Sequence, residues 1–285
     1  MPFSNIFAQL DNEYYQLTSA EKRVADYVVA HQRQTQYMSI SELAENCNVA
    51  EATISRFCRR MGYKGYSAFK LAVANSVTAG QGAAAVVGER ALESPGGEHP
   101  FQELLETDVE AILQTGRLNH PEEIRRAAEL LLGADTVLCM GQGGSMIMAQ
   151  EAAHLFSTIR PGFFAVQDSH LQSIRCAQLT ERDVVFYFSY SGATRDLTDV
   201  LKQARERQAS VILITRFPKS PAAVYANVVL QCGSNESPTQ LGTVAARMAQ
   251  LFLLDILYHD VCALDPEGAA ANQDRVARAL SEKHL

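Results

Sequence analysis

The feature that most limits the possible folds is a series of short, almost uninterrupted apolar runs in the second half of the chain. Apolar runs of this kind are typical of strands that are covered on both faces of a sheet. Helical segments lie between consecutive runs, and right-handed crossovers between parallel strands are the natural assembly of that pattern. We therefore predict an α/β fold here, a five-stranded parallel sheet in an α-β-α sandwich, with strands at residues 135–140, 162–166, 184–188, 210–214 and 228–231.

The first part of the chain follows a helical period instead. Two short segments, 40–48 and 51–62, are joined tightly through Asn48, and Gly62 is placed to end the second helix in a left-handed conformation. Longer helices are expected before and after them, at 18–32 and 66–77. These residues predict an all-α N-terminal domain.

A stretch rich in Gly and Ala, residues 78–100, separates the two patterns and shows no sustained apolar period. Such composition is typical of a linker. We therefore predict a helical domain over 1–77 and an α/β domain over 101–285, which opens with helices at 101–117 and 121–132.

The net charge of −7 argues at first against a nucleic-acid partner, but its distribution does not. Residues 50–75 contain five bases and one acid, a net charge of +4, whereas residues 76–285 carry 17 bases and 25 acids. A locally basic segment on an acidic protein can hold DNA while the remainder binds something else.

Other features exclude several classes of protein. The N-terminus lacks the basic-then-apolar layout of a secretory signal, and no apolar run approaches the roughly 18 residues that span a bilayer. The pairs Glu151/His154 and Asp255/His259 lack a third metal ligand. We expect a cytoplasmic protein with no membrane partner, no metal and no cofactor. Buried, reduced thiols are expected at Cys47, Cys58, Cys139, Cys176, Cys232 and Cys262.

The segment 51–62 has the character of a DNA-recognition helix. When its apolar residues are buried, its polar and basic residues face solvent. A recognition helix needs polar donors for base edges and cations for phosphates. A small helical bundle with a solvated basic face would show the same pattern. The candidate DNA-binding residues are Thr53, Ser55, Arg56, Arg59 and Arg60, with Lys64, Tyr66 and Lys70 as further backbone contacts.

Three stretches carry a resemblance to a known family: Leu43-Ala44, Ala52 to Phe57, and Gly62 to Lys70. The segment that holds them resembles the N-terminal helix-turn-helix domain of RpiR/MurR-type transcriptional regulators. The family usually has Ser ahead of the recognition helix, where this chain has Ala50. The substitution removes a capping hydroxyl worth about 1 kcal/mol.

Two loops in the second domain suit a phosphate. The first predicted strand ends in Gly141-Gln142-Gly143-Gly144-Ser145, and glycines at a strand-to-helix turn let the backbone approach an anion. This loop does not complete a dinucleotide fingerprint, because Met146 stands where the third glycine belongs. The third predicted strand ends in the hydroxyl-rich run Ser189 to Thr194. Both runs also suit plain turns, but parallel strands bring the two loops to one edge of the sheet.

Residues 120–260 are similar to the SIS, or sugar isomerase, domain, whose hallmark is an S-x-S-G-x-T loop after a strand. The resemblance implies that the phosphate of a sugar phosphate is held by Ser145, Ser189, Ser191 and Thr194 with backbone around Gly144 and Tyr190. It also suggests sugar contacts from His170 and from Glu236, which lies near the place of the catalytic Glu in enzymes of this fold.

Together these patterns predict a sugar-phosphate-responsive, DNA-binding transcriptional regulator of carbohydrate metabolism, with no catalytic residues. Its expected partners are a double-stranded DNA operator, a phosphorylated sugar effector and further copies of itself, in a homodimer or homotetramer. The helix at 243–258 is apolar on nearly every side, so it is either buried or self-associating. The alternatives are an aldose–ketose sugar-phosphate isomerase with Glu236 as base, and a plain sugar-phosphate-binding scaffold protein.

Overall fold

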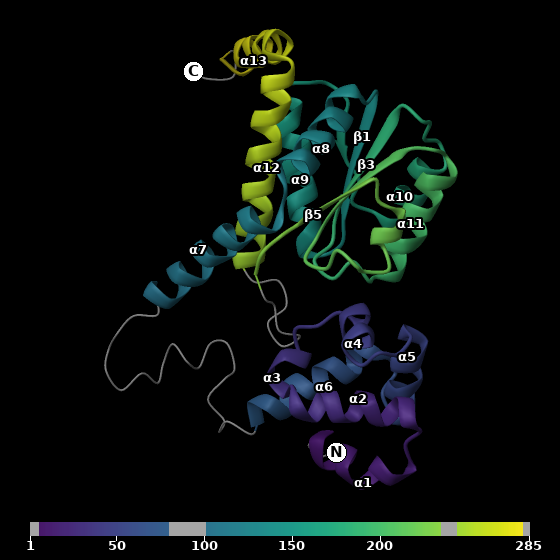
Figure 1. The fold of residues 1–285 in the computed structure, drawn as a ribbon. Helices are drawn as coiled ribbons and strands as arrows, with labels where there is room; N and C mark the ends of the chain where they lie inside the picture. The colour runs from purple at the N-terminus through teal and green to yellow at the C-terminus, as the bar shows by residue number, and fades with distance from the viewer. Residues whose placement is uncertain (1–5, 80–100, 235–243, 282–285) are drawn as a thin grey trace. The chain divides into compact units, whose positions relative to one another are not determined.

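The structure is a computed structural model, and it describes residues 6–79, 101–234 and 244–281 (Figure 1). Contacts divide the chain into two compact units. One contains the N-terminal helices and the other contains a parallel sheet with its covering helices. None of the six cysteines forms a disulfide, and five of them are buried.

The first unit is a bundle of short helices around one apolar core. The inner face of one helix, α5 (Glu51–Arg60), is completely buried at Ile54, Phe57 and Cys58, as the sequence predicts. The Phe57 ring packs edge-on against Phe69 with 5.5 Å between centroids. The helices are α1 (Ile6–Glu13), η1 (Tyr14–Gln16), α2 (Ser19–Ala30), α3 (Gln32–Thr35), α4 (Ile40–Asn46), α5 (Glu51–Arg60) and α6 (Tyr66–Ala79).

Local sequence signals fix where these helices begin and end. Thr18 caps α2 and Ser39 caps α4, each in a capping box with the Glu three residues later. Ala50 precedes α5 without a side-chain capping bond, so the capping hydroxyl is missing as predicted. Asn48 and Gly62 adopt positive φ, 52° and 83°, which suits the tight turn and the helix end expected there.

The second unit contains a five-stranded, wholly parallel sheet in the order β2-β1-β3-β4-β5. This confirms the predicted α/β sandwich. The strands are β1 (Thr136–Gly141), β2 (Phe163–Ala165), β3 (Asp183–Phe188), β4 (Ser210–Thr215) and β5 (Val228–Gln231). The helices are α7 (Phe101–Leu118), α8 (Pro121–Gly133), α9 (Gly144–Ser157), α10 (Ser169–Cys176), α11 (Arg195–Glu206), η2 (Ala223–Tyr225), α12 (Val244–Leu264) and α13 (Pro266–Ser281).

Helices cover both faces of the sheet (Figure 1). Alternate strand residues point to opposite sides, so Cys139 and Phe186 join the core beneath α8, α9 and α12, whereas Met140 and Tyr187 join the core beneath α10 and α11. The apolar helix α12 packs against α8 and α9, so much of its apolar surface lies in the core.

The strand order creates a switch point beside β1, which marks a candidate ligand site at the carboxyl ends of the strands. From β1 the chain crosses to β2 on one side, and β3 lies on the other side of β1. Gly141 at the end of β1 pairs in register with Phe188 at the end of β3. In open α/β sheets, ligands bind at such a switch point, outside the carboxyl ends of the strands. The two loops singled out in the sequence start here, side by side, and we call the space between them the crevice.

Candidate functional site

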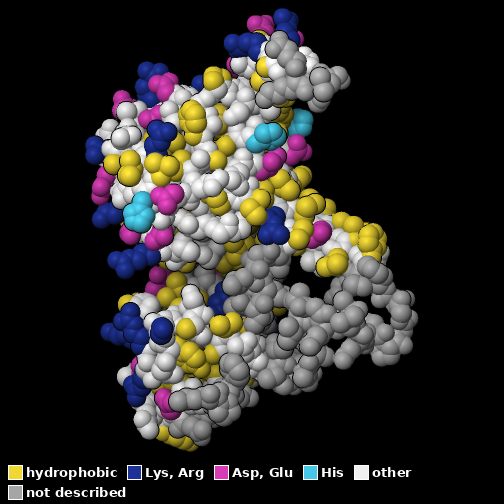
Figure 2. Space-filling model, turned by 180° about the vertical axis from the view of Figure 1, so that it is seen from behind, with side chains coloured by type: hydrophobic (Ala, Val, Ile, Leu, Met, Phe, Trp, Pro, Cys, Tyr) yellow, Lys and Arg dark blue, Asp and Glu magenta, His cyan; other side chains and the backbone are white. Residues whose placement is uncertain are grey.

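The α5 helix presents a basic, open face. The side chains of Arg56 and Arg59 are exposed, Thr53 and Ser55 are partly exposed, and Lys64 is exposed just beyond the helix. The Arg56 guanidinium lies 3.4 Å from Thr53 Oγ1. Figure 2 shows several Lys and Arg side chains on the surface of the first unit. These residues have the freedom and the charge that contact with a phosphate backbone needs.

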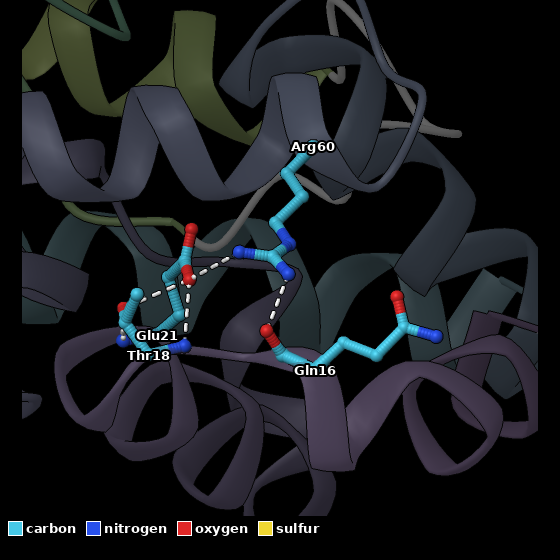
Figure 3. A network of polar contacts seen from close by, with 4 residues as sticks. All are labelled: Gln16, Thr18, Glu21 and Arg60. Carbon is cyan, nitrogen blue, oxygen red and sulfur yellow. Dashed lines mark hydrogen bonds and ion pairs between the residues drawn. The ribbon is translucent and has the colours of Figure 1, made fainter.

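Arg60, at the end of the same helix, is exposed as well, but its guanidinium is tied to α2 and η1 (Figure 3). Its Nη1 lies 3.1 Å from Glu21 Oε2, and its Nη2 donates to the carbonyl oxygen of Gln16. Burial acts to raise the pKa of Glu21, but the hydrogen bonds from Thr18 and the charge of Arg60 outweigh it, so the pKa is lowered. Arg60 therefore fastens α5 to the capping box of α2.

Two further candidates also contact the bundle. The Tyr66 hydroxyl donates to the carbonyl oxygen of Met38 at 2.9 Å, and burial raises the pKa of Tyr66 well above its usual value. Burial lowers the pKa of Lys70 to about 8, against a smaller opposing effect of Glu42. The open face is thus formed by Thr53, Ser55, Arg56, Arg59 and Lys64, whereas Arg60, Tyr66 and Lys70 lie within the domain's own contacts.

The sequence did not reveal the clamp that holds the turn between α4 and α5. Arg23, on α2, donates through Nε to the carbonyl oxygen of Cys47 and through Nη2 to that of Asn48, both at 3.2 Å. Ser41 on α4 donates to the carboxylate of Glu51 at 2.6 Å. These bonds hold α4 and α5 at a fixed angle, and that angle sets the direction in which the exposed face of α5 points.

In the second unit, the loop after β1 turns tightly into α9. A Cβ atom at Gly141 would lie 2.6 Å from the carbonyl oxygen of Ser145, so only glycine fits there. Gly143 has a φ of 54° and precedes α9 without a side-chain capping bond. Gly144 is exposed and Ser145 is half-buried. The N–H groups of Ser145 and Met146 in the first turn of α9 donate to the carbonyl oxygens of Gln142 and Gly143, both at 3.1 Å. This turn therefore offers an anion the positive end of the helix dipole and the Ser145 hydroxyl.

The loop after β3 presents three hydroxyl groups. The Oγ atom of buried Ser189 accepts from the N–H of Gly192 at 3.2 Å, and Ser191 Oγ accepts from the N–H of Ala193 at 3.3 Å. Each serine still has its own O–H to donate. Thr194 is exposed and precedes α11 without a side-chain capping bond. We call residues 189–194 the hydroxyl loop.

The end of β4 and the loop that follows it anchor the hydroxyl loop by donating hydrogen bonds to carbonyl groups of the hydroxyl loop. The carbonyl oxygen of Tyr190 accepts from Thr215 Oγ1 and from the N–H of Arg216, both at 3.0 Å. The carbonyl oxygen of Gly192 accepts from the N–H of Ala222 at 3.1 Å. Carbonyl oxygens repel anions, and here those of residues 190 and 192 are paired within the protein. This arrangement leaves the hydroxyl donors of the loop for a phosphate.

The other candidates are less closely connected to this loop. His170 is exposed in the first turn of α10. Two residues later, buried Gln172 donates to the carbonyl oxygen of Gly141 at 3.3 Å and lies 3.2 Å from the amide of Gln142. The helix that carries His170 is thereby tied to the loop after β1. Glu236 lies outside the described residues.

Arg247, in the first turn of α12, is a residue that the sequence reasoning missed. Its Nη1 lies 3.6 Å from the position that a Cβ atom of Gly144 would take, so a positive charge stands beside the start of α9. The available signal was the single charged residue in the run from Val244 to Leu254, which apart from Gln250 is otherwise apolar.

No group of three or more His, Cys, Asp or Glu side chains is placed to hold a metal ion within residues 6–79, 101–234 and 244–281. Of the helices that the structure describes, none has the length and apolarity to cross a membrane.

Comparison with known proteins identifies both domains of the chain. Residues 4–80 match the model of the helix-turn-helix domain of the rpiR family, and residues 130–260 match the SIS domain. An HTH-type transcriptional regulator of Caldanaerobacter subterraneus is 32% identical over 85% of this chain and 84% of its own. The HTH-type transcriptional regulator HexR of Pseudomonas aeruginosa is 30% identical over 89% of this chain and 87% of its own.

A solved structure extends the likeness over both units. The NanR protein of Vibrio vulnificus, complexed with ManNAc-6P, has the same fold with a TM-score of 0.88, 24% identity, and coverage of 99% of this chain and 100% of its own. The two matched domains and the full-length relatives lead to one assignment. The chain belongs to the rpiR family of HTH-type transcriptional regulators, DNA-binding proteins with a C-terminal SIS domain.

Proposed function

We propose that this regulator binds a phosphorylated sugar in the crevice and that the bound sugar changes its affinity for an operator. The observation that carries the proposal is the meeting of two donor-rich loops at the switch point of the sheet. Ser189, Ser191 and Thr194 supply hydroxyls, Ser145 supplies a further hydroxyl, and the backbone around Gly144 brings the positive end of the α9 dipole to the site. Hydroxyl and N–H donors make short, strong bonds to phosphate oxygens, and the NanR of the same fold was solved with a sugar phosphate.

The charge and the side chains around the two loops bear on the choice of effector. Arg247 stands beside Gly144, where its positive charge favours the phosphate of the effector. His170 is a further sugar contact in this proposal, and Glu236 stays a candidate from the sequence alone. We assign these residues to binding and none to catalysis. Proton exchange at C2 of a bound sugar phosphate, followed by NMR in deuterated water, would instead reveal an isomerase.

The DNA partner is a double-stranded operator read by α5. Arg56, Arg59 and Lys64 are proposed phosphate or base contacts, with Thr53 and Ser55 near the base edges. We propose that the protein acts as a homodimer or homotetramer, so that a two-fold operator spaces its half-sites by whole helical turns. Exposed apolar side chains on α7, such as Val109 at 45% and Leu113 at 49% exposure, support self-association.

A thermal-shift screen tests the effector directly. Purified protein is melted with hexose, pentose and amino-sugar phosphates, with the unphosphorylated sugars as controls. Because a ligand that binds the folded state raises its stability by mass action, at least one phosphorylated sugar is expected to raise the melting temperature. The matching unphosphorylated sugar is expected to leave it unchanged. Equal shifts with both forms, or none with any phosphate, would contradict the proposed site.

A further inference from the structure

The loop after β4, residues 216–222, contains a buried hydroxyl group that lacks a hydrogen-bond partner among the described residues. Ser220 is 1% exposed, and its Oγ atom is unpaired. Its backbone N–H is satisfied by the carbonyl oxygen of Phe217 at 3.0 Å. A buried polar group without a partner destabilises the state that contains it, and its presence in a native protein calls for an explanation.

The unpaired hydroxyl lies directly against the hydroxyl loop. A Cβ atom at Gly192 would overlap both Oγ and Cβ of Ser220 and would lie 3.0 Å from Thr215 Oγ1. The glycine also has a φ of 58°. Ser220 therefore occupies the space that the missing side chain of Gly192 leaves beneath the loop.

The polar groups around Ser220 are already paired with one another. The Thr215 hydroxyl donates to the carbonyl oxygen of Tyr190 at 3.0 Å and accepts from the N–H of Phe217 at 3.3 Å. The N–H of Gly192 donates to Ser189 Oγ at 3.2 Å. This last bond uses Ser189 Oγ as acceptor and leaves its O–H to donate, so the bond is lost only if the Ser189 side chain rotates to bring that O–H to a bound phosphate.

We propose that Ser220 is a positioning residue of the hydroxyl loop. When the hydroxyl of Ser189 turns toward a bound phosphate, the Oγ atom of Ser220 takes its place as the acceptor for the N–H of Gly192. The hydroxyl that is unpaired in the ligand-free protein gains its partner only in the bound state. The proposal rests on the proposed function, since it requires a phosphate in the crevice.

The variant Ser220→Ala separates this role from a merely structural one, because it moves two quantities in opposite directions. Removal of an unpaired buried hydroxyl is expected to raise the melting temperature of the ligand-free protein by about 2–4 °C. Loss of the acceptor in the bound state is expected to weaken binding of phosphorylated sugar by about two- to tenfold. A residue that only supports the fold would lower the melting temperature on substitution.

The measurements use the full chain, titrated with ManNAc-6P, glucose 6-phosphate and inorganic phosphate. Ser157→Ala is the matched control: Ser157 ends α9, far along that helix from the crevice, and its Oγ donates to the carbonyl oxygen of Ala153 at 2.6 Å. This control is expected to leave the affinity unchanged and not to raise the melting temperature.

Two results would overturn the role of Ser220 alone. One is equal affinity of the wild type and Ser220→Ala for these phosphates, and the other is a melting temperature of ligand-free Ser220→Ala below that of the wild type. A wild-type protein that binds none of the three probes would contradict the proposed phosphate site, and the role of Ser220 with it. The proposal is supported only if the ligand-free Ser220→Ala variant melts at a higher temperature than the wild type and also binds phosphorylated sugar more weakly.

Discussion

At the scale of single residues, two neighbouring arginines of α5 are expected to differ in role. Arg59 is exposed, whereas Arg60 is bound to Glu21 and Gln16. Arg59→Ala is expected to reduce the salt dependence of binding to a DNA duplex by about one counterion. Arg60→Ala is expected to leave that slope unchanged and to lower the free energy of unfolding by about 0.5–1 kcal/mol, since the ion pair is partly exposed.

Fluorescence anisotropy over a range of salt concentrations, with urea unfolding of the same variants, makes this comparison. A duplex of arbitrary sequence suffices, because the electrostatic contribution does not depend on sequence. An Arg60→Ala variant that loses as much salt dependence as Arg59→Ala would place Arg60 on the DNA after all.

Lys70 offers a second prediction at this scale, with a defined pH dependence. Burial lowers the pKa of its ammonium group to about 8, so the charge destabilises the folded state at neutral pH. Lys70→Met is therefore expected to raise the free energy of unfolding at pH 7 by about 1–2 kcal/mol, after allowance for solvent screening.

The sign of its pH dependence follows from the lowered pKa. Below pH 8 both folded and unfolded forms carry the charge, and the cost is present in full. From about 8 up to the ordinary lysine pKa of 10.5 the folded form is neutral while the unfolded form stays charged. The advantage of Lys70→Met is thus expected to shrink as pH rises through that range. Urea unfolding of both proteins at pH 7 and pH 9.5 measures it, and an advantage that grows with pH would be inconsistent with a buried ammonium group.

At the scale of structural elements, the hydroxyl loop depends on glycine at position 192. Gly192→Ala combines an unfavourable φ of 58° with overlap against Ser220, and is expected to lower the free energy of unfolding by about 2 kcal/mol and to remove the phosphate response. Gly133→Ala, at the end of α8, meets nothing within 4 Å and is the matched control. Equal stability of the two variants in urea unfolding would show that the loop tolerates a side chain.

The strands and most of the helices could be predicted from the sequence, whereas contacts between distant elements could not. Each strand is a continuous apolar run, so the strands were placed to within one or two residues, and the two loops followed from their ends. The helix α13 was missed because its buried surface is small: Ala269 is its buried residue among those described. The pair Arg60–Glu21 was not predictable, since the two residues are 39 positions apart and meet only through the packing of α2 and α5. The role of Glu236 stays a prediction, because that residue lies outside the described ranges.

At the scale of the whole molecule, the proposed function joins two sites on one chain through a coupling free energy. If a phosphorylated sugar changes DNA affinity by some factor, DNA must change sugar affinity by the same factor. The coupling requires both sites intact, but each site binds its own ligand without the other. Variants in the hydroxyl loop are therefore expected to lose the response to the sugar while they retain DNA binding.

The measurement that tests this most directly is the affinity for a selected operator, with and without each phosphorylated sugar, for the wild type, Ser191→Ala and Thr194→Val. We predict that one phosphorylated sugar, and not its unphosphorylated form, shifts the wild-type affinity. Both variants are predicted to keep their basal affinity within about fivefold, or 1 kcal/mol, and to show no shift. Complete loss of DNA binding in both variants, or an undiminished shift in both, would contradict the proposed function.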